Sequence, residues 1–325
     1  MKKLSGILIA VIMVIGLVVG GFSFSETRKH ITSNDLQEIE KGFQEEKVVE
    51  NEDNLKGLED EFNDKEEMNK EKEENKKHET INTEDGKKPL PNIGDYGQEG
   101  HKSSKKVFLT FDDGPTSLTP KILDILKEHD VLATFFVIGK LAEDQPDIVQ
   151  RTYDEGHMVL PHSYSHDYSI YSTFETFYDD FYRAEEVVEN ILNIEVPPIF
   201  RFPGGSSNHS SFRYGGKQFM PQLTEDIKEK GYYYIDWNVS SGDAGPDYND
   251  KDKMLNNIFQ GAKNKDFIVV LCHDVSWNVK MAEILPQVIT TLREQGYQFR
   301  TFKDITEEEL NKMVSLKIAN KSIVR

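Results

Sequence analysis

The stretch that decides the fold is KKVFLTFDDGPTSLTPKILDILKEHDVLATFFVI, residues 105–138. An apolar run at 107–111 is followed by an amphipathic segment at 121–129 and then by a second apolar run at 134–138. Short apolar runs predict buried strands, and apolar positions at helical spacing predict a helix that covers them. This strand–helix–strand order is typical of a parallel α/β architecture.

The same alternation continues to residue 302. Further apolar runs lie at 157–160, 199–202, 232–237, 267–271 and 298–302, separated by amphipathic stretches such as 146–155, 174–192, 223–230, 254–262 and 281–295. Seven strand-like runs in about 200 residues predict a barrel somewhat smaller than the standard eight-stranded (β/α) barrel. A doubly wound open sheet is the structural alternative.

Composition divides the 325 residues into unlike segments. Residues 26–104 hold 23 acidic and 13 basic side chains, and only residues 105–325 are apolar enough to bury a sizeable core. We therefore expect a disordered charged linker at 26–104, a folded domain at 105–305 and a C-terminal tail at 306–325. The net charge of −18 argues against binding to nucleic-acid phosphates. The single cysteine, Cys272, excludes an intramolecular disulfide.

The N-terminus predicts export. Two lysines precede 22 uncharged residues, 4–25, which as a helix would span roughly 33 Å, against about 30 Å for a hydrocarbon core. With the positive end in the cytoplasm, everything after residue 25 lies outside the membrane. Residues 1–25 are thus a retained signal anchor, or a signal peptide if they are cleaved.

Ionisable side chains follow or close five of the seven predicted strands. They are Asp112 and Asp113, His162 and His166, Arg201, Asp236, and His273 with Asp274. The carboxyl ends of parallel strands meet at one edge of a sheet or barrel, where α/β enzymes assemble their active sites. The sequence therefore predicts a single site built from these positions.

Two imidazoles and a carboxylate predict a divalent-metal site. His162 and His166 are four residues apart, and the Asp112-Asp113 pair supplies carboxylates from a neighbouring strand end. Two histidines and one carboxylate form a common metal-binding triad that leaves positions open. The second carboxylate can then act as a general base. His157 lies inside a predicted strand, which favours a structural role.

A second set of observations concerns His273. A histidine at the end of the most apolar strand can protonate a leaving amine when a nearby carboxylate holds its tautomer. Cys272 alternates with its neighbours and is interpreted as a buried apolar residue. A serine hydrolase is not favoured, because no Gly-x-Ser-x-Gly elbow occurs in the sequence.

Together these positions resemble the polysaccharide deacetylases of the NodB-homology group, carbohydrate esterase family 4, over about residues 105–305. The first family motif is present as TFDDGP, residues 110–115, and the second as HSYSH, residues 162–166. The third reads RFPGG, residues 201–205, the fourth ends in Asp236-Trp237, and the fifth is LCH, residues 271–273. All five motifs stand in the family's order.

The resemblance implies a distorted (β/α) barrel of about seven parallel strands that removes acetyl groups from a polysaccharide. It implies a divalent metal, Zn²⁺ first, with Co²⁺, Ni²⁺ or Mn²⁺ as alternatives. By analogy the metal ligands are Asp113, His162 and His166, the general base is Asp112 and the general acid is His273. It further implies that Arg201 tethers Asp112, that Asp236 tunes His273, that the Gly204 N–H binds the oxyanion, and that Trp237 and Leu271 line the acetyl pocket.

Three residues depart from the family pattern. Phe202 stands where proline is usual, Gly204 where a bulkier residue is common, and Pro161 where asparagine is frequent. The segments 201–206 and 236–243 are nevertheless similar to those of exported bacterial peptidoglycan deacetylases that act on N-acetylglucosamine.

We therefore expect a membrane-tethered, extracytoplasmic hydrolase that removes N-acetyl groups from peptidoglycan glycan strands and confers lysozyme resistance. The catalytic domain is expected to be monomeric and to bind no nucleic acid. The alternatives are a deacetylase of another glycan, such as N-acetylmuramic acid residues, chitin oligomers or acetylxylan, and a non-catalytic carbohydrate-binding relative.

Overall fold

The computed structural model describes residues 105–325, which fold as a parallel α/β protein. The predicted signal segment, residues 1–25, and the predicted linker, residues 26–104, lie outside the described residues. No helix within the described range is both long and apolar enough to cross a membrane.

Each of the seven predicted apolar runs contains a strand. The strands are β1 (Lys105–Gly114), β2 (Thr134–Ile138), β3 (Met158–Ser163), β4 (Ile199–Phe200), β5 (Tyr233–Tyr234), β6 (Val239–Ser240), β7 (Phe267–His273) and β8 (Tyr297–Arg300). Six of them form one sheet in the order β3-β2-β1-β7-β6, with β8 paired to the first half of β1. Strands β4 and β5 form a separate two-stranded sheet.

The strand pairing gives the expected fold of about seven parallel strands in more detail. Among residues 105–325 there are eight strands in two sheets, because β6 adds a strand that the sequence did not indicate. Strand β6, at the end of the larger sheet, and strands β4 and β5, which form the smaller sheet, are each only two residues long. Pro197 and Pro198 precede β4 and offer no N–H to a neighbouring strand. Ile235, the residue after β5, forms an isolated antiparallel bridge with Ala319 of the C-terminal segment.

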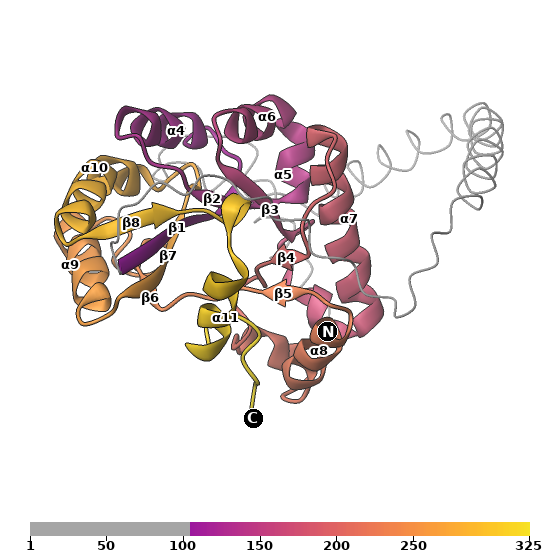
Figure 1. Ribbon diagram of the computed structural model, residues 1–325. Helices are drawn as coiled ribbons and strands as arrows, with labels where there is room; N and C mark the ends of the chain where they lie inside the picture. Colours follow the sequence, from indigo (N-terminus) through magenta and orange to yellow (C-terminus); the bar gives the residue numbers. More distant parts are fainter. Residues whose placement is uncertain (1–104) are drawn as a thin grey trace, which may run out of the picture. The chain divides into compact units, whose positions relative to one another are not determined.

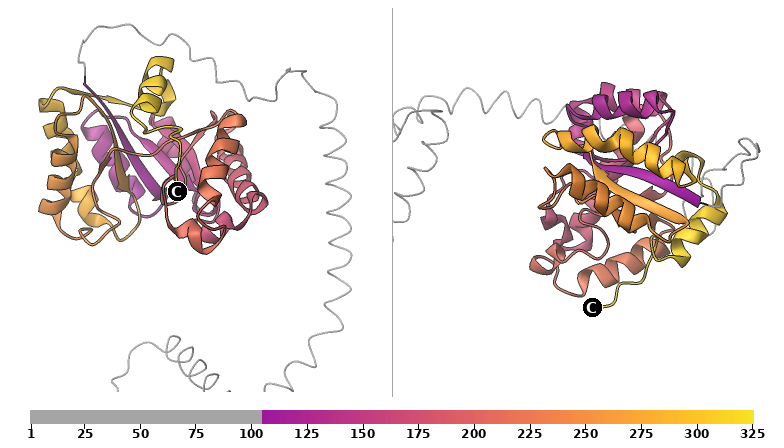
Figure 2. Two further views of the ribbon diagram at one scale, coloured as in Figure 1. Left: turned by 90° about the horizontal axis from the view of Figure 1, so that it is seen from below. Right: turned by 90° about the vertical axis from the view of Figure 1, so that its left-hand side faces the viewer.

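Helices cover the outside of the strands (Figures 1 and 2). They are α4 (Thr119–Glu128), α5 (Gly139–Asp144), α6 (Pro146–Asp154), α7 (Phe174–Leu192), α8 (Phe219–Glu229), α9 (Lys251–Ala262), α10 (Val279–Glu294) and α11 (Glu307–Ser315). Short 3₁₀ turns lie at Tyr168–Ser172, Ser210–Arg213 and Phe302–Asp304. Strands β2 and β7 are buried along nearly their whole length, as expected for parallel strands covered on both faces.

A second apolar cluster lies around β4, β5, α7 and α8, and it explains one departure from the family pattern. Phe202 is fully buried there, with its ring centroid 4.7 Å from that of Phe200 and 5.4 Å from that of Phe177. The Tyr171 hydroxyl donates a hydrogen bond of 2.9 Å to the carbonyl of Pro203. Phe202 therefore anchors the chain immediately before Gly204 by filling an aromatic core.

The expected C-terminal tail is part of the folded unit. Helix α11 begins with a capping box between Thr306 and Glu309, which satisfies two backbone N–H groups. Leu310 and Met313 are buried in the main core, and so is Ile318 beyond the helix. The folded unit thus extends past residue 305, the boundary expected from the sequence.

Candidate active site

Three predicted metal ligands meet at the carboxyl ends of β1 and β3. Asp113 Oδ1 lies 3.4 Å from Nε2 of His162 and 3.1 Å from Nε2 of His166. The three ligand atoms all fall within 4.8 Å of one another. Asp113 and His166 have positive φ angles of 71° and 56°, a backbone conformation that non-glycine residues rarely adopt. Such conformations concentrate at functional sites, where the surrounding structure maintains them.

The donor set fits a divalent cation. Nδ1 of His162 lies 2.7 Å from the Arg201 carbonyl oxygen, which can only accept, so Nδ1 carries the proton and Nε2 keeps its lone pair. Asp113 Oδ1 is buried and has no hydrogen-bond partner besides its contacts with the two histidines. Burial alone would raise the Asp113 pKa, but His166 and His162 hold it well below its usual range. An ionised carboxylate and a correctly oriented imidazole are the ligand forms that Zn²⁺ and similar ions require.

Asp112 lies beside this triad and is held by Arg201. Nη1 of the fully buried Arg201 donates to Asp112 Oδ1 at 2.7 Å and to Thr110 Oγ1 at 2.8 Å. Nε and Nη2 donate to the carbonyls of Ile235 and Asp236. The expected contact between Arg201 and Asp112 is therefore present. The guanidinium joins β1 to the two residues that follow β5.

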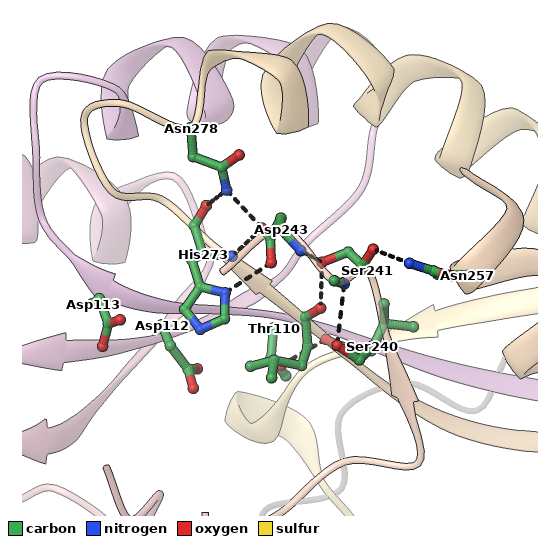
Figure 3. Close-up of polar contacts among 12 residues, drawn as sticks. Thr110, Asp112, Asp113, Ser240, Ser241, Asp243, Asn257, His273 and Asn278 are labelled. Atoms are coloured by element: carbon green, nitrogen blue, oxygen red, sulfur yellow. Dashed lines mark hydrogen bonds and ion pairs between the residues drawn. The ribbon is translucent and has the colours of Figure 1, made fainter. Parts of the chain in front are cut away.

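His273 is oriented by Asp243 rather than by Asp236, which corrects the sequence-based prediction (Figure 3). Asp243 Oδ1 lies 2.8 Å from Nδ1 of His273, and Oδ2 accepts the His273 backbone N–H at 2.8 Å. Asn278 Nδ2 donates to Asp243 Oδ2 at 2.7 Å. Burial alone would lower the pKa of His273, but the Asp243 hydrogen bond and the charges of Asp243, Asp112 and Asp113 raise it to about 9.

Comparisons with known proteins identify the family of this chain. The sequence profile of the polysaccharide deacetylase family matches residues 99–219. The peptidoglycan-N-acetylmuramic acid deacetylase PdaA of Bacillus subtilis is 32% identical over 224 residues, covering 67% of this chain and 77% of that protein. The peptidoglycan-N-acetylglucosamine deacetylase PgdA of Listeria monocytogenes is 32% identical over 210 residues, 64% of this chain and 40% of that protein.

This chain belongs to the polysaccharide deacetylase family. A solved structure supports the same conclusion at the level of the fold. The catalytic domain of peptidoglycan N-acetylglucosamine deacetylase from Eubacterium rectale is 36% identical, with a TM-score of 0.57 over 62% of this chain and 89% of that one. The enzymes of this family hydrolyse N-acetyl amide bonds.

Asp236 has other partners in this deacetylase. Its Oδ1 accepts the Ser206 backbone N–H at 2.8 Å, and its Oδ2 accepts the Ser206 hydroxyl at 2.6 Å. The ammonium of Lys321 lies 2.7 Å from Oδ2. The Asp236 carboxylate therefore binds Ser206, in the loop after Gly204, and Lys321, in the C-terminal segment. Asp243 follows β6, so its place after a strand could have marked it as a site residue. Because β6 is only two residues long, it cannot be recognised as a strand from the sequence.

Gly204 starts a tight loop beside the metal triad. Its φ is 72°, and a Cβ added there would lie 2.8 Å from the Tyr168 hydroxyl oxygen, so Tyr168 occupies the space of the family's bulkier residue. The Trp237 ring packs against Gly205 in the same way, at 2.9 Å from an added Cβ. Leu271 lies in β7, two residues before the strand ends at His273, and its carbonyl accepts from the backbone N–H and the hydroxyl of Ser241. The acetyl-pocket roles of Gly204, Trp237 and Leu271 remain predictions.

Three further polar residues near the site have structural positions. Nδ1 of His157 accepts the Ala133 N–H at 3.1 Å, and burial lowers the His157 pKa to about 4, which confirms its structural role. Cys272 is fully buried, and burial raises its thiol pKa, so it is no nucleophile. The Asp274 carboxyl accepts from the Thr119 hydroxyl, and its backbone N–H donates to the Asp112 carbonyl. Burial raises the Asp274 pKa to about 7.

Proposed function

We propose that this protein removes acetyl groups from N-acetylglucosamine residues of peptidoglycan. The observation that carries the proposal is one site that joins an Arg201-bound carboxylate, an Asp-His-His triad and a carboxylate-bound imidazole. These are the groups that hydrolysis of an amide requires: a base, a cation site and an acid. The printed names of the relatives from Listeria and Eubacterium support N-acetylglucosamine as the sugar.

The residues divide the reaction between them. A divalent ion bound by Asp113, His162 and His166 would supply Lewis acidity and a nucleophilic water. Asp112 takes the proton from the attacking water, whose oxygen forms a bond to the acetyl carbon. The Gly204 N–H would stabilise the developing oxyanion. His273 then gives its proton to the sugar nitrogen as the carbon–nitrogen bond breaks, so acetate and a free amine leave.

Two features of the site suit these assignments. Arg201 donates to Asp112 Oδ1 and so holds the carboxylate of the proposed base in one orientation beside the triad. The raised pKa of His273 keeps its imidazole protonated at neutral pH, which is the form that a general acid must have. His273 thus enters the proposed reaction in the form that can donate a proton.

The proposed setting is the outer face of the cell membrane. The uncharged segment 4–25 behind two lysines supports export and anchoring, and the charged segment 26–104 supports a tether of about 50 Å root-mean-square length. A monomeric catalytic domain with Zn²⁺ or a similar ion is proposed. Deacetylation converts neutral amides into cationic amines, so we propose that it lowers lysozyme cleavage of the wall.

Acetate release tests the proposal. The purified chain with Zn²⁺ is incubated with peptidoglycan, N-acetylglucosamine oligomers, acetylxylan and a muramic-acid-containing glycan, and acetate is measured. We expect release from the first two substrates and a loss of about a hundred- to ten-thousand-fold for Asp112→Asn. Undiminished release by Asp112→Asn would overturn the mechanism.

One observation favours a second substrate. The Bacillus subtilis relative is named for N-acetylmuramic acid, and it is as similar to this chain as the Listeria relative. Release from muramic acid residues alone would therefore replace the proposed sugar while keeping the chemistry. A chain that releases no acetate and is unaffected by chelator would instead be a carbohydrate-binding relative.

A further inference from the structure

The C-terminal segment 318–325 lies in a fixed register along the edge of β5. The Asp236 N–H donates to the Ile318 carbonyl at 2.7 Å, and the Asn320 N–H donates to the Tyr234 carbonyl at 3.2 Å. The Asn320 side chain accepts the Tyr234 N–H at 3.0 Å and donates to the Tyr232 carbonyl at 3.2 Å. Four hydrogen bonds thus fix the backbone immediately before Lys321 (Figure 1, yellow).

Lys321 extends from this segment to a buried carboxylate. Its ammonium lies 2.7 Å from Oδ2 of Asp236, whose side chain is only 6% exposed. Asp236 is the residue that holds both the backbone N–H and the hydroxyl of Ser206. Removing the cationic partner of a buried carboxylate is costly, so we expect the contact with Lys321 to hold Asp236 in place for Ser206.

A second contact joins the same segment to the same loop. The Arg325 guanidinium donates to the Asn208 carbonyl at 2.7 Å and lies over the Phe212 ring at 4.8 Å from its centroid. The Asn208 side chain in turn donates to the Gly205 carbonyl at 2.9 Å. The segment therefore reaches the loop formed by residues 204–208 at two points: at Ser206, through Asp236, and at Asn208.

We propose that Lys321 is a positioning residue that acts through Asp236 and Ser206 to fix the N–H of Gly204 for the oxyanion. This inference rests on the proposed function and adds a residue outside the five sequence motifs. A preorganised donor acts only if it stands where negative charge develops, and a displacement of about 1 Å can reduce the rate about 100-fold. Because an oxyanion donor acts where charge develops in the transition state, the effect belongs in kcat rather than in KM.

The test compares Lys321→Met with Lys321→Arg and with Lys312→Met in the full chain. Lys312 is an exposed lysine on α11 and serves as the matched control. The first readout is backbone hydrogen exchange of the peptide that covers residues 203–208, where the N–H groups of Gly205 and Ser206 are hydrogen-bonded. The second is kcat and KM for acetate release from an N-acetylglucosamine oligomer with Zn²⁺.

We expect exchange of this peptide to quicken at least 10-fold in Lys321→Met, and kcat to fall about 10- to 100-fold with KM within about twofold. Lys321→Arg should restore both, and Lys312→Met should change neither. If Lys321→Met unfolds at the assay temperature, Lys321→Gln replaces it, because an amide still donates to Asp236 without charge.

Unchanged exchange at 203–208 in Lys321→Met would overturn the inference, whether or not the parent chain releases acetate. Equal losses of activity in Lys321→Met and Lys321→Arg would also overturn it. An arginine at this position can still pair with Asp236, as the lysine does, whereas a methionine cannot. A parent chain without acetate release would count against the proposed function alone, and the exchange measurement would still decide whether Lys321 holds the loop.

Discussion

At the scale of single residues, the pairing of His273 with Asp243 sets the pH range of the proposed reaction. His273 acts as an acid, so activity falls as pH rises through its folded pKa of about 9. Asp243→Asn removes the main group that raises this pKa, while burial continues to lower it. We expect the basic limb of the pH profile of kcat/KM to move down by at least about one pH unit, and kcat to fall by about 100-fold or more.

Asp236→Asn is the contrasting variant. The side chain of Asp236 contacts Ser206 and Lys321, so its loss should change kcat without moving the basic limb. A limb that moves in Asp236→Asn and stays fixed in Asp243→Asn would restore the family-based assignment that the structure corrects.

The sequence located most of the site at this scale because the predicted residues lie at or shortly after the carboxyl end of a recognisable apolar run. Asp113, His162 and His166 come together because parallel strands place their carboxyl ends at one edge. Asp243 was missed because it follows a strand of two residues, which leaves no periodicity to read. Lys321 was missed because its contact with Asp236 spans 85 positions, and no local pattern encodes such a contact.

At the scale of elements, α11 is attached to the first strand by a buried ion pair. The Glu309 side chain is 1% exposed, with Oε1 2.9 Å from Lys106 Nζ and 2.9 Å from Arg300 Nε. Burial would raise the Glu309 pKa, but these cations lower it, so the pair stabilises the fold above the unfolded pKa and is lost as pH falls. Glu309→Gln should cost about 3 kcal/mol, a fall in Tm of about 6–12 °C.

Calorimetry at neutral pH measures this effect, with Glu308→Gln as the control. Glu308 is the exposed neighbour on the same helix, and its substitution should stay within about 0.5 kcal/mol of the parent. A fall in Tm no larger for Glu309→Gln than for Glu308→Gln would show that α11 is held by its apolar face alone.

Apolar patterns in the sequence predicted the long strands but not the short ones. The buried strands β1, β2 and β7 were predicted within a few residues because at least four apolar side chains in five consecutive positions mark each of them. The separation of β4 and β5 from the larger sheet was not predicted, because the pairing of β4, β5 and β6 depends on residues distant in the sequence. Residues 306–325 were interpreted as a tail because their charged positions outnumber the few apolar ones that reach the core, such as Leu310.

At the scale of the whole molecule, the predicted metal site connects parts of the chain that fold together. Asp113 ends β1, while His162 lies in β3 and is held by the Arg201 carbonyl after β4. A cation bound by these ligands stabilises the folded chain only, since the unfolded chain cannot assemble the site. Metal binding should therefore appear in global stability, independently of any substrate.

Zn²⁺ at about 100 times its Kd should stabilise the chelator-treated protein by about 2.7 kcal/mol, a rise in Tm of about 5–10 °C. His162→Gln should abolish most of this rise, because it removes the ligand whose Nε2 the Arg201 carbonyl sets free for metal. His157→Gln is the matched control: it removes a buried imidazole that binds the Ala133 N–H, so its Tm falls but its rise with Zn²⁺ persists. Differential scanning calorimetry with and without chelator measures both. Equal rises in the two histidine variants would show that the cation binds elsewhere and would remove the basis for assigning Asp113, His162 and His166 as its ligands.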